Sequence, residues 1–222
     1  MEFDDFLRLF TKLKKNKVDA GIAHSQLAPN IRDEQIKQTH MEHIKPKNAA
    51  VLLLVYPNTN REMSLLLMRR NQYKGTHSRQ ISFPGGKLES QDIDLWSTAL
   101  RETFEEVGIS SNQIFLIRPL SQLYVPPSNF LISPFLAYTK HPCEFVPDRK
   151  EVDKIIEIPL KNLISTEPFM TKQYSSSLEL IYAPAYIFDQ DEVWGATAMT
   201  VSYTHLRAHE TPEHRGVRGR GE

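Results

Sequence analysis

The chain has 222 residues, of which 40% are hydrophobic and 24% charged. This length favours one large domain, and the composition excludes a wholly disordered or fibrous protein. Lys and Arg together number 27, as do Asp and Glu, so the zero net charge gives no electrostatic reason for nucleic-acid binding. The single cysteine, Cys143, excludes an intrachain disulfide, and the acidic start at Asp4 and Asp5 is unlike a secretory signal. We therefore expect a cytoplasmic protein.

The N-terminal region, residues 1–44, is predicted to be a helix followed by a connecting arm. Apolar residues recur at helical spacing over residues 2–16, and lysines gather at the end of that segment, where a helix dipole favours cations. The polar segment from about residue 18 to 48 has weak periodicity and two prolines, Pro29 and Pro46. Its role cannot be read from the sequence.

The domain predicted for residues 45–201 begins with a β-hairpin. Two apolar runs, Ala49–Tyr56 and Met63–Met68, flank a turn-rich stretch. The first run is too short to cross a bilayer, so we predict no membrane segment. A short strand over Gln80–Phe83 then enters a tight loop at Pro84–Gly86. Further β-like runs are Ile114–Tyr124, Phe130–Tyr138, Val152–Ile158 and Leu178–Phe188. Helices and strands therefore mix in one α/β or α+β domain.

Residues 94–107 form the most informative predicted helix. Asp94 stands at the start as an N-cap, and Gly108 follows the end, where a left-handed residue is common. The spacing predicts an inward face of Trp96, Ala99, Leu100, Thr103, Phe104 and Val107. It places Glu102, Glu105 and Glu106 together on the opposite side.

Three neighbouring carboxylates repel one another unless a cation compensates their charge. Mg²⁺ fits this pattern, because it binds a few carboxylates together with waters and substrate phosphates. The alternative is a solvated acidic face that forms salt bridges with Arg101.

The segments Gly86–Asp92 and Arg101–Ile109 resemble the Nudix box, whose usual form is G-x5-E-x7-R-E-U-x-E-E-x-G-U. Thr103 stands where a bulky apolar residue is usual. The first half is one residue longer than the usual form, and Asp92 replaces the expected Glu. Both departures resemble the coenzyme A pyrophosphatase branch of the Nudix family.

A second block supports that branch. His77–Gly86, preceded by Leu66–Arg70, is similar to the motif that the branch carries ahead of its box and that is associated with coenzyme A. Arg79 occupies a place where glycine is common. The resemblance implies substrate-binding roles for Arg69, His77, Phe83, Gly85 and Gly86.

The resemblance implies an α/β/α sandwich with a mixed sheet, and hydrolysis of the diphosphate of coenzyme A or acyl-CoA to 3',5'-ADP and a 4'-phosphopantetheine product. Glu102, Glu105 and Glu106 would hold Mg²⁺ or Mn²⁺; Glu105, Glu102 and Arg101 would be the catalytic residues. Alternatives are a Nudix hydrolase of ADP-ribose or a related compound, and a Nudix-fold ligand sensor. The expected partner is a small diphosphate, not nucleic acid or membrane, and a homodimer is left open.

The C-terminal segment, residues 202–222, differs from the rest of the chain. It contains three of the eight histidines and three of the nine glycines, with little to bury. The preceding Val193–Met199 resembles the start of the family's closing helix. We predict that the segment is a non-native tail, disordered or locally helical, and without function.

Overall fold

The computed structural model describes residues 27–32, 45–72, 79–174 and 180–209, together with Phe3, Phe6 and Ile36. The side chains of residues 203–209 are not included. Most of the predicted N-terminal helix lies outside these residues, although Phe3 and Phe6 are both helical. His77 also lies outside them.

The main sheet of the described chain has eight strands, and its central strand is β1 (Lys47–Pro57). β1 runs parallel to β7 and antiparallel to β2 and β4. The other strands of the main sheet are β2 (Met63–Arg70), β3 (Ile81–Ser82), β4 (Gly85–Lys87), β5 (Phe115–Pro119), β6 (Leu123–Val125), β7 (Phe130–Tyr138) and β8 (Val152–Pro159). The predicted hairpin of the first two runs is confirmed.

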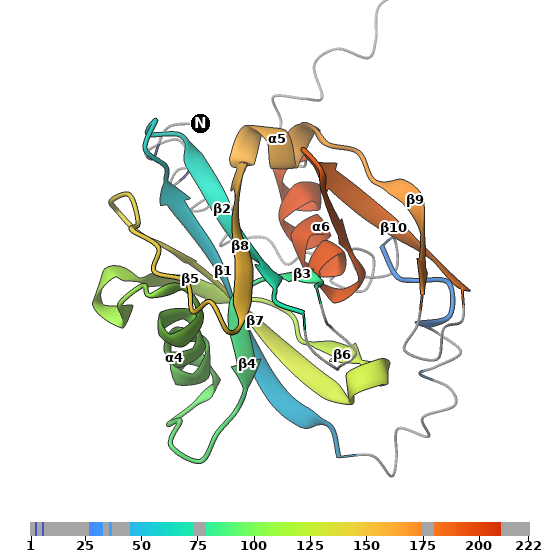
Figure 1. The fold of residues 1–222 in the computed structure, drawn as a ribbon, viewed down its shortest axis with the longest axis horizontal. Helices are drawn as coiled ribbons and strands as arrows, with labels where there is room; N and C mark the ends of the chain where they lie inside the picture. Colours follow the sequence, from blue (N-terminus) through green and yellow to red (C-terminus); the bar gives the residue numbers. More distant parts are fainter. Residues whose placement is uncertain are drawn as a thin grey trace, which may run out of the picture.

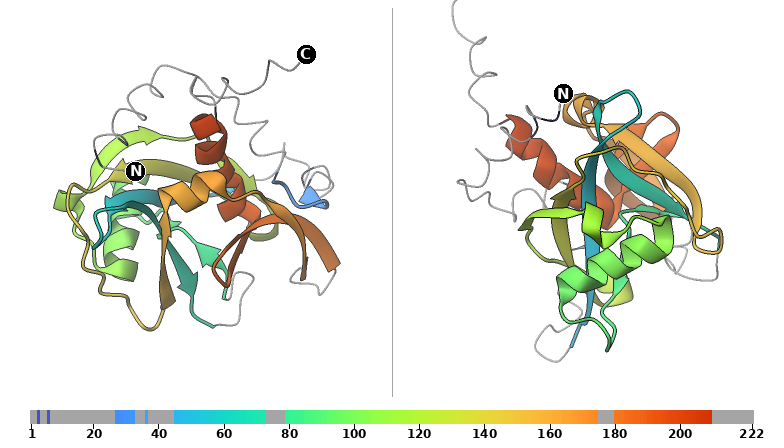
Figure 2. Two further views of the ribbon diagram at one scale, coloured as in Figure 1. Left: turned by 90° about the horizontal axis from the view of Figure 1, so that it is seen from above. Right: turned by 90° about the vertical axis from the view of Figure 1, so that its left-hand side faces the viewer.

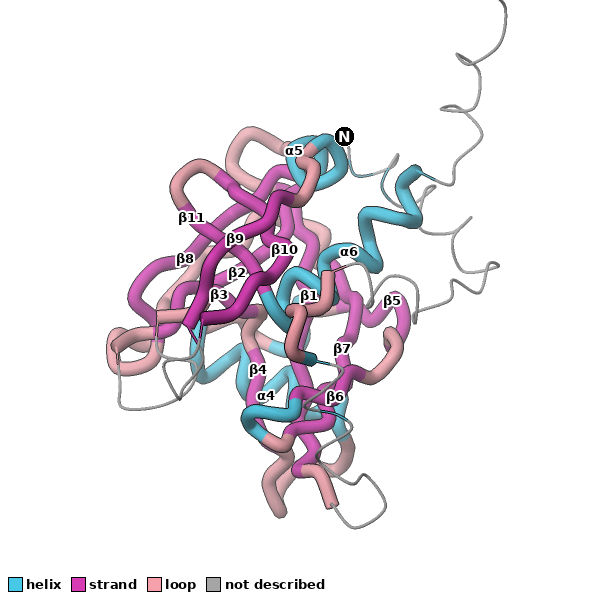
Figure 3. Tube along the Cα trace, turned by 90° about the vertical axis from the view of Figure 1, so that its right-hand side faces the viewer, coloured by secondary structure: helices cyan, strands magenta, loops and turns pink. Residues whose placement is uncertain are grey.

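A smaller antiparallel sheet follows, made of β9 (Phe169–Tyr174), β10 (Leu180–Phe188) and β11 (Asp191–Trp194). The helices are α4 (Leu95–Val107), α5 (Leu160–Ser165) and α6 (Gly195–His209), with short 3-10 turns η1 (Ser111–Gln113) and η2 (Pro126–Ser128). α4 and α6 lie on opposite sides of the main sheet (Figures 1 and 2). α6 packs beside the smaller sheet (Figure 3).

The two faces of β1 account for this sandwich. Ala50, Leu52, Leu54 and Tyr56 belong to the cluster that packs against α4, whereas Leu53 and Val55 belong to the cluster that includes α6. Side chains alternate across a strand, so a strand that is apolar at every position needs cover on both faces. The expected α/β/α sandwich with a mixed sheet is present.

Three expectations about the elements need revision. The run Ile114–Tyr124 is divided into β5 and β6, and β9 and β11 were not anticipated. β9 has exposed residues at four of its six positions, so it lacks the apolar signal of a core strand. The boundary expected before Ser202 falls inside α6, and Ser202 itself is 3% exposed. Residues 210–222 lie outside the described chain.

Within the described part of the chain, no helix has both the length and the apolarity needed to cross a membrane.

Candidate active site

The segment Phe83–Gly86, called the glycine loop below, leads from β3 into β4 and enters the main sheet beside the first half of β1. β4 pairs with β1 through Val51↔Gly85 and Ala50↔Gly86, and the N–H of Leu52 donates to the carbonyl of Pro84 at 2.9 Å. Gly85 has a φ of 151°, and a Cβ there would lie 2.3 Å from the carbonyl oxygen of Ala50. Glycine is therefore required at Gly85 by both conformation and space.

Helix α4 stands over this loop, and both of its predicted ends are confirmed. The Asp94 carboxylate accepts from the N–H of Ser97 at 2.7 Å, and the Ser97 hydroxyl accepts from the N–H of Asp94 in return. This reciprocal pair is a capping box. At the other end, Gly108 is left-handed and donates to the carbonyl of Phe104 at 2.9 Å.

The rotation of α4 about its axis differs from the prediction. Ala99, Thr103 and Val107 are buried as expected, but Phe104 is 58% exposed and Glu106 is 1% exposed. Glu106 therefore lies on the inner face, and Phe104 points to solvent. Thr103, which stands where the family has a bulky apolar residue, is accommodated because its hydroxyl donates to the carbonyl of Ala99 at 2.7 Å.

Glu106 is held between the glycine loop and β2. One carboxylate oxygen accepts from the N–H of Gly85 at 2.8 Å, and the other accepts from Nη1 of Arg70 at 3.1 Å. Burial raises the pKa of Glu106 to about 8, although Arg70 and the Gly85 N–H favour the charged form. The negative charges of Glu102 and Glu151 raise this pKa further.

Glu102 lies one turn before Glu106 and faces Gly86. A Cβ on Gly86 would lie 2.3 Å from a carboxylate oxygen of Glu102, so the backbone and the carboxylate are in close contact. Burial also raises the pKa of Glu102, and Arg101 partly opposes this shift. Two partly desolvated carboxylates therefore lie beside one glycine loop.

Arg101 links the loop after β4 to α4. Its Nε and Nη2 contact the two carboxylate oxygens of Asp92 at 2.9 and 3.0 Å. Its Nη1 donates to Glu102 at 3.0 Å and to Glu105 at 2.9 Å. The Arg101 guanidinium holds the pKa of Asp92 well below its usual range. These contacts hold Glu102 and Glu105 on the same side of Arg101.

The described residues include no group of three His, Cys, Asp or Glu side chains gathered around a point that could hold a metal ion. Glu105 contacts the Arg101 guanidinium, and its side chain is 53% exposed. Glu102 and Glu106 still fit Mg²⁺ or Mn²⁺, because Mg²⁺ needs only one or two protein carboxylates when substrate phosphates supply other oxygens. Burial disfavours the charged form of both carboxylates and so raises their pKa values, and a bound cation would offset that cost.

The residues predicted to bind substrate lie in different surroundings: Arg69 forms salt bridges between strands, and Phe83 is in the core. Arg69 forms salt bridges with Asp153 at 2.7 Å and with Asp191 at 3.5 Å, which join β2 to β8 and β11. Phe83 is 3% exposed and is part of the core on the α6 side. Arg79 has a φ of 59°, which explains why glycine is common at its position.

Sequence reasoning missed two features near the site. One is the contact between Arg70 and Glu106, which the sequence did not indicate. The arm residues 27–32 and the start of α6 border a cavity beside the glycine loop. The sequence holds no local signal for either, because each depends on residues far apart in the chain.

Comparisons with known proteins identify the family of this chain. The model of the NUDIX domain family matches residues 46–174. Human mitochondrial coenzyme A diphosphatase NUDT8 is 30% identical over 162 residues, covering 72% of this chain and 68% of that protein. An uncharacterized Nudix hydrolase, NudL of Yersinia pestis (strain Pestoides F), is 29% identical over 169 residues, which cover 74% of this chain and 82% of that protein.

Among solved structures, a MutT/nudix family protein from Enterococcus faecalis superimposes with a TM-score of 0.51 at 17% identity, covering 82% of this chain and 71% of that one. This likeness supports the fold alone. The family match spans both the glycine loop and helix α4, which carry the described carboxylates. The chain therefore belongs to the Nudix hydrolase family.

Proposed function

We propose that this Nudix hydrolase cleaves the diphosphate bond of coenzyme A or acyl-CoA, giving 3',5'-ADP and 4'-phosphopantetheine or its acyl ester. The observation that carries the proposal is the pair of partly desolvated carboxylates, Glu102 and Glu106, held against the glycine loop. The similarity to the human coenzyme A diphosphatase supports the choice of substrate.

Nudix hydrolases generally use divalent metal ions. Bound Mg²⁺ or Mn²⁺ would neutralise phosphate charge and polarise the bond that is broken. Glu102 and Glu106 would hold the ion, and Glu105 is proposed as a further ligand and as the base, together with Glu102, for the attacking water. Arg101 positions Glu102 and Glu105 through its contacts. The backbone at Gly85 and Gly86 lets the diphosphate approach without a side chain in the way.

Incubation of the purified protein with coenzyme A and Mg²⁺, followed by mass spectrometry, tests the reaction. We expect 3',5'-ADP and 4'-phosphopantetheine in equal amounts, no turnover in EDTA, and recovery on adding Mg²⁺ or Mn²⁺. Undiminished turnover in EDTA would contradict the metal assignment. A higher kcat/KM for ADP-ribose than for coenzyme A would replace the proposed substrate, and binding without products would indicate a ligand sensor.

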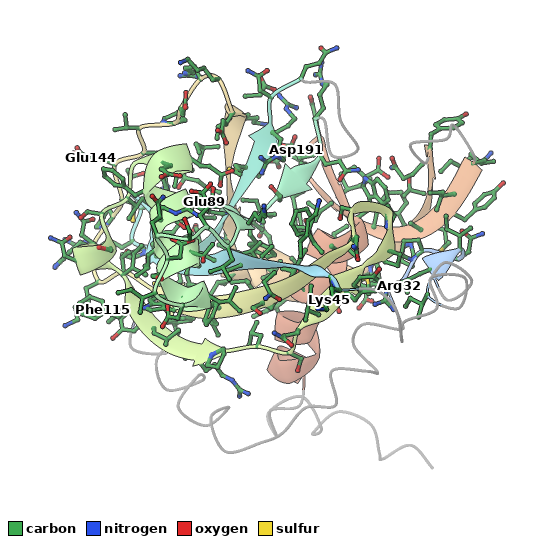
Figure 4. The ribbon with its side chains drawn as sticks, turned by 90° about the horizontal axis from the view of Figure 1, so that it is seen from below. Arg32, Lys45, Glu89, Phe115, Glu144 and Asp191 are labelled. Carbon is green, nitrogen blue, oxygen red and sulfur yellow. The ribbon has the colours of Figure 1, made fainter. Side chains whose placement is uncertain are left out.

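Glu106→Gln tests the role of the buried carboxylate. The amide keeps the shape but loses the charge, so kcat should fall by about 100-fold or more. The melting temperature should fall by only a few degrees, because the amide oxygen can still accept from either Gly85 or Arg70 but not from both. Glu144→Gln, at an exposed glutamate on another segment of the chain (Figure 4), is the matched control. Near-normal turnover in Glu106→Gln would disprove the assignment.

A further inference from the structure

A cavity of about 530 Å³ opens beside the glycine loop. One side is formed by the main sheet, through residues such as Val51 and Ile132, and by Phe83, Gly85 and Gly86 of the loop. This volume is within the range of pockets that enclose a drug-sized molecule. The cavity therefore has room for a large group attached to a diphosphate at the loop.

Much of the opposite wall comes from segments outside the range matched by the family model, residues 46–174. The start of α6 contributes Ala196 and Thr197, and the Thr197 hydroxyl donates to the carbonyl of Ile81 at 2.9 Å. This contact fixes α6 to β3, two residues before Phe83. The position of the wall is therefore tied to the glycine loop.

The arm at residues 27–32 closes another side. The Asn30 N–H donates to the carbonyl of Tyr182 on β10 at 3.0 Å, and the Tyr182 N–H donates to the side-chain oxygen of Asn30 at 3.2 Å. Arg32 donates to the carbonyl of Tyr124 on β6 at 3.2 Å. Figure 4 shows Arg32 beside the strands of the smaller sheet. The arm thus bridges the two sheets across the cavity, and Ile31 lies on its lining.

The chemistry of the lining limits what can occupy the cavity. Most described lining residues are apolar; the charged ones are Arg32, Arg70 and Lys87, and none is Asp or Glu. The hydroxyl oxygens of Ser82 and Ser128, both lining residues, have no hydrogen-bond partner among the described residues. A mostly apolar, extended chain with a few hydrogen-bonding groups suits the apolar part of this lining better than a small polyhydroxylated sugar. The three cations suit the phosphates to which such a chain is attached in the proposed substrate.

We infer that this cavity receives the acyl-pantetheine chain of the substrate, and that the arm at residues 27–32 and the start of α6 are its specificity-determining walls. This inference rests on the proposed function for the identity of the chain. It assigns a role to the connecting arm, which the sequence left without one. It also implies that the family-matched domain alone would not select the substrate.

Binding of S-octanoyl-pantetheine, which has no diphosphate, tests the cavity separately from hydrolysis. Isothermal titration calorimetry without metal should show binding to the wild-type protein. Two variants fill the cavity from different walls: Ala196→Phe on α6 and Ile31→Trp on the arm. Each should weaken binding by about tenfold or more. Ile187→Trp introduces the same side chain on β10 at a residue that is 48% exposed and outside the cavity lining, so binding should be unchanged.

Melting temperatures identify any variant that fails to fold, and the partly exposed Ile31 does not depend on core packing. Equal affinities for the wild type and a folded Ile31→Trp variant would overturn the inference. Coenzyme A hydrolysis without octanoyl-pantetheine binding would also overturn it while leaving the proposed function intact. Conversely, the wild type could bind octanoyl-pantetheine, lose that binding in the filled variants, and still not hydrolyse coenzyme A. That result would support the cavity as the binding site for the chain and reject the proposed reaction.

Discussion

The two adjacent glycines of the loop should respond differently to substitution by alanine. At Gly86, the added Cβ would lie 2.3 Å from a carboxylate oxygen of Glu102 and 2.4 Å from its carboxyl carbon. The end of a glutamate side chain can retreat, and an ordinary contact would require a shift of about 1 Å. That shift also strains the contact with Arg101. Misplacement of a positioned group by 1 Å can reduce activity by about 100-fold.

At Gly85, the added Cβ would lie 2.3 Å from the Ala50 carbonyl oxygen and 2.7 Å from the Cα of Val51. Both atoms belong to the backbone of β1 and cannot retreat without disturbing the sheet. The φ of 151° adds conformational strain for alanine. Overpacking and strain each cost roughly 1–3 kcal/mol, so Gly85→Ala should lose about 2–6 kcal/mol of stability.

The assay pairs kcat/KM for coenzyme A in Mg²⁺ with the melting temperature of each variant. Gly86→Ala should lose about 100-fold in kcat/KM with little change in melting temperature. Gly85→Ala should melt roughly 10 °C lower, given about 2–4 °C per kcal/mol for a chain of this size. Glu102→Asp, which shortens the side chain, should restore part of the activity in the Gly86→Ala background. Activity of Gly86→Ala within threefold of wild type, or an equal loss of melting temperature in both variants, would refute the reasoning.

Two predictions concern stability, measured by urea unfolding. Because Arg101 lowers the pKa of Asp92 in the folded state, the ionised carboxylate stabilises the protein above its unfolded pKa of about 3.9, and this stabilisation declines as the pH falls towards the lowered value. Asp92→Asn should therefore lose roughly 1.5–3 kcal/mol at pH 7 and less at pH 3, and an equal loss at both would contradict the pKa assignment. Phe104→Ala should cost less than about 1 kcal/mol because Phe104 is exposed, whereas Phe83→Ala should cost about 3–5 kcal/mol. If Phe104→Ala lost as much unfolding free energy as Phe83→Ala, Phe104 would face the core, as the sequence predicted.

Helix α4 shows where sequence reasoning succeeds and where it stops. Its ends could be predicted because Asp94 and Gly108 act on backbone groups within one turn of themselves. Its rotation could not, because the spacing placed Glu106 with the other two glutamates opposite the inward face. Glu106 is buried since Gly85 and Arg70 donate to it from 21 and 36 residues away in the sequence. A periodicity argument contains no information about such distant donors.

By itself, the sequence determined the family, the α/β character, the hairpin of β1 and β2, and the set of glutamates and glycines near the site. These follow from local signals: apolar runs, caps, and motifs whose residues are close together in the chain. Only the tertiary structure decided that Glu106 is enclosed while Glu105 is exposed, and that the arm and α6 border the cavity beside the loop. The physical reason is that desolvation and enclosure depend on every segment that packs around a group, and those segments are brought together only when the chain folds.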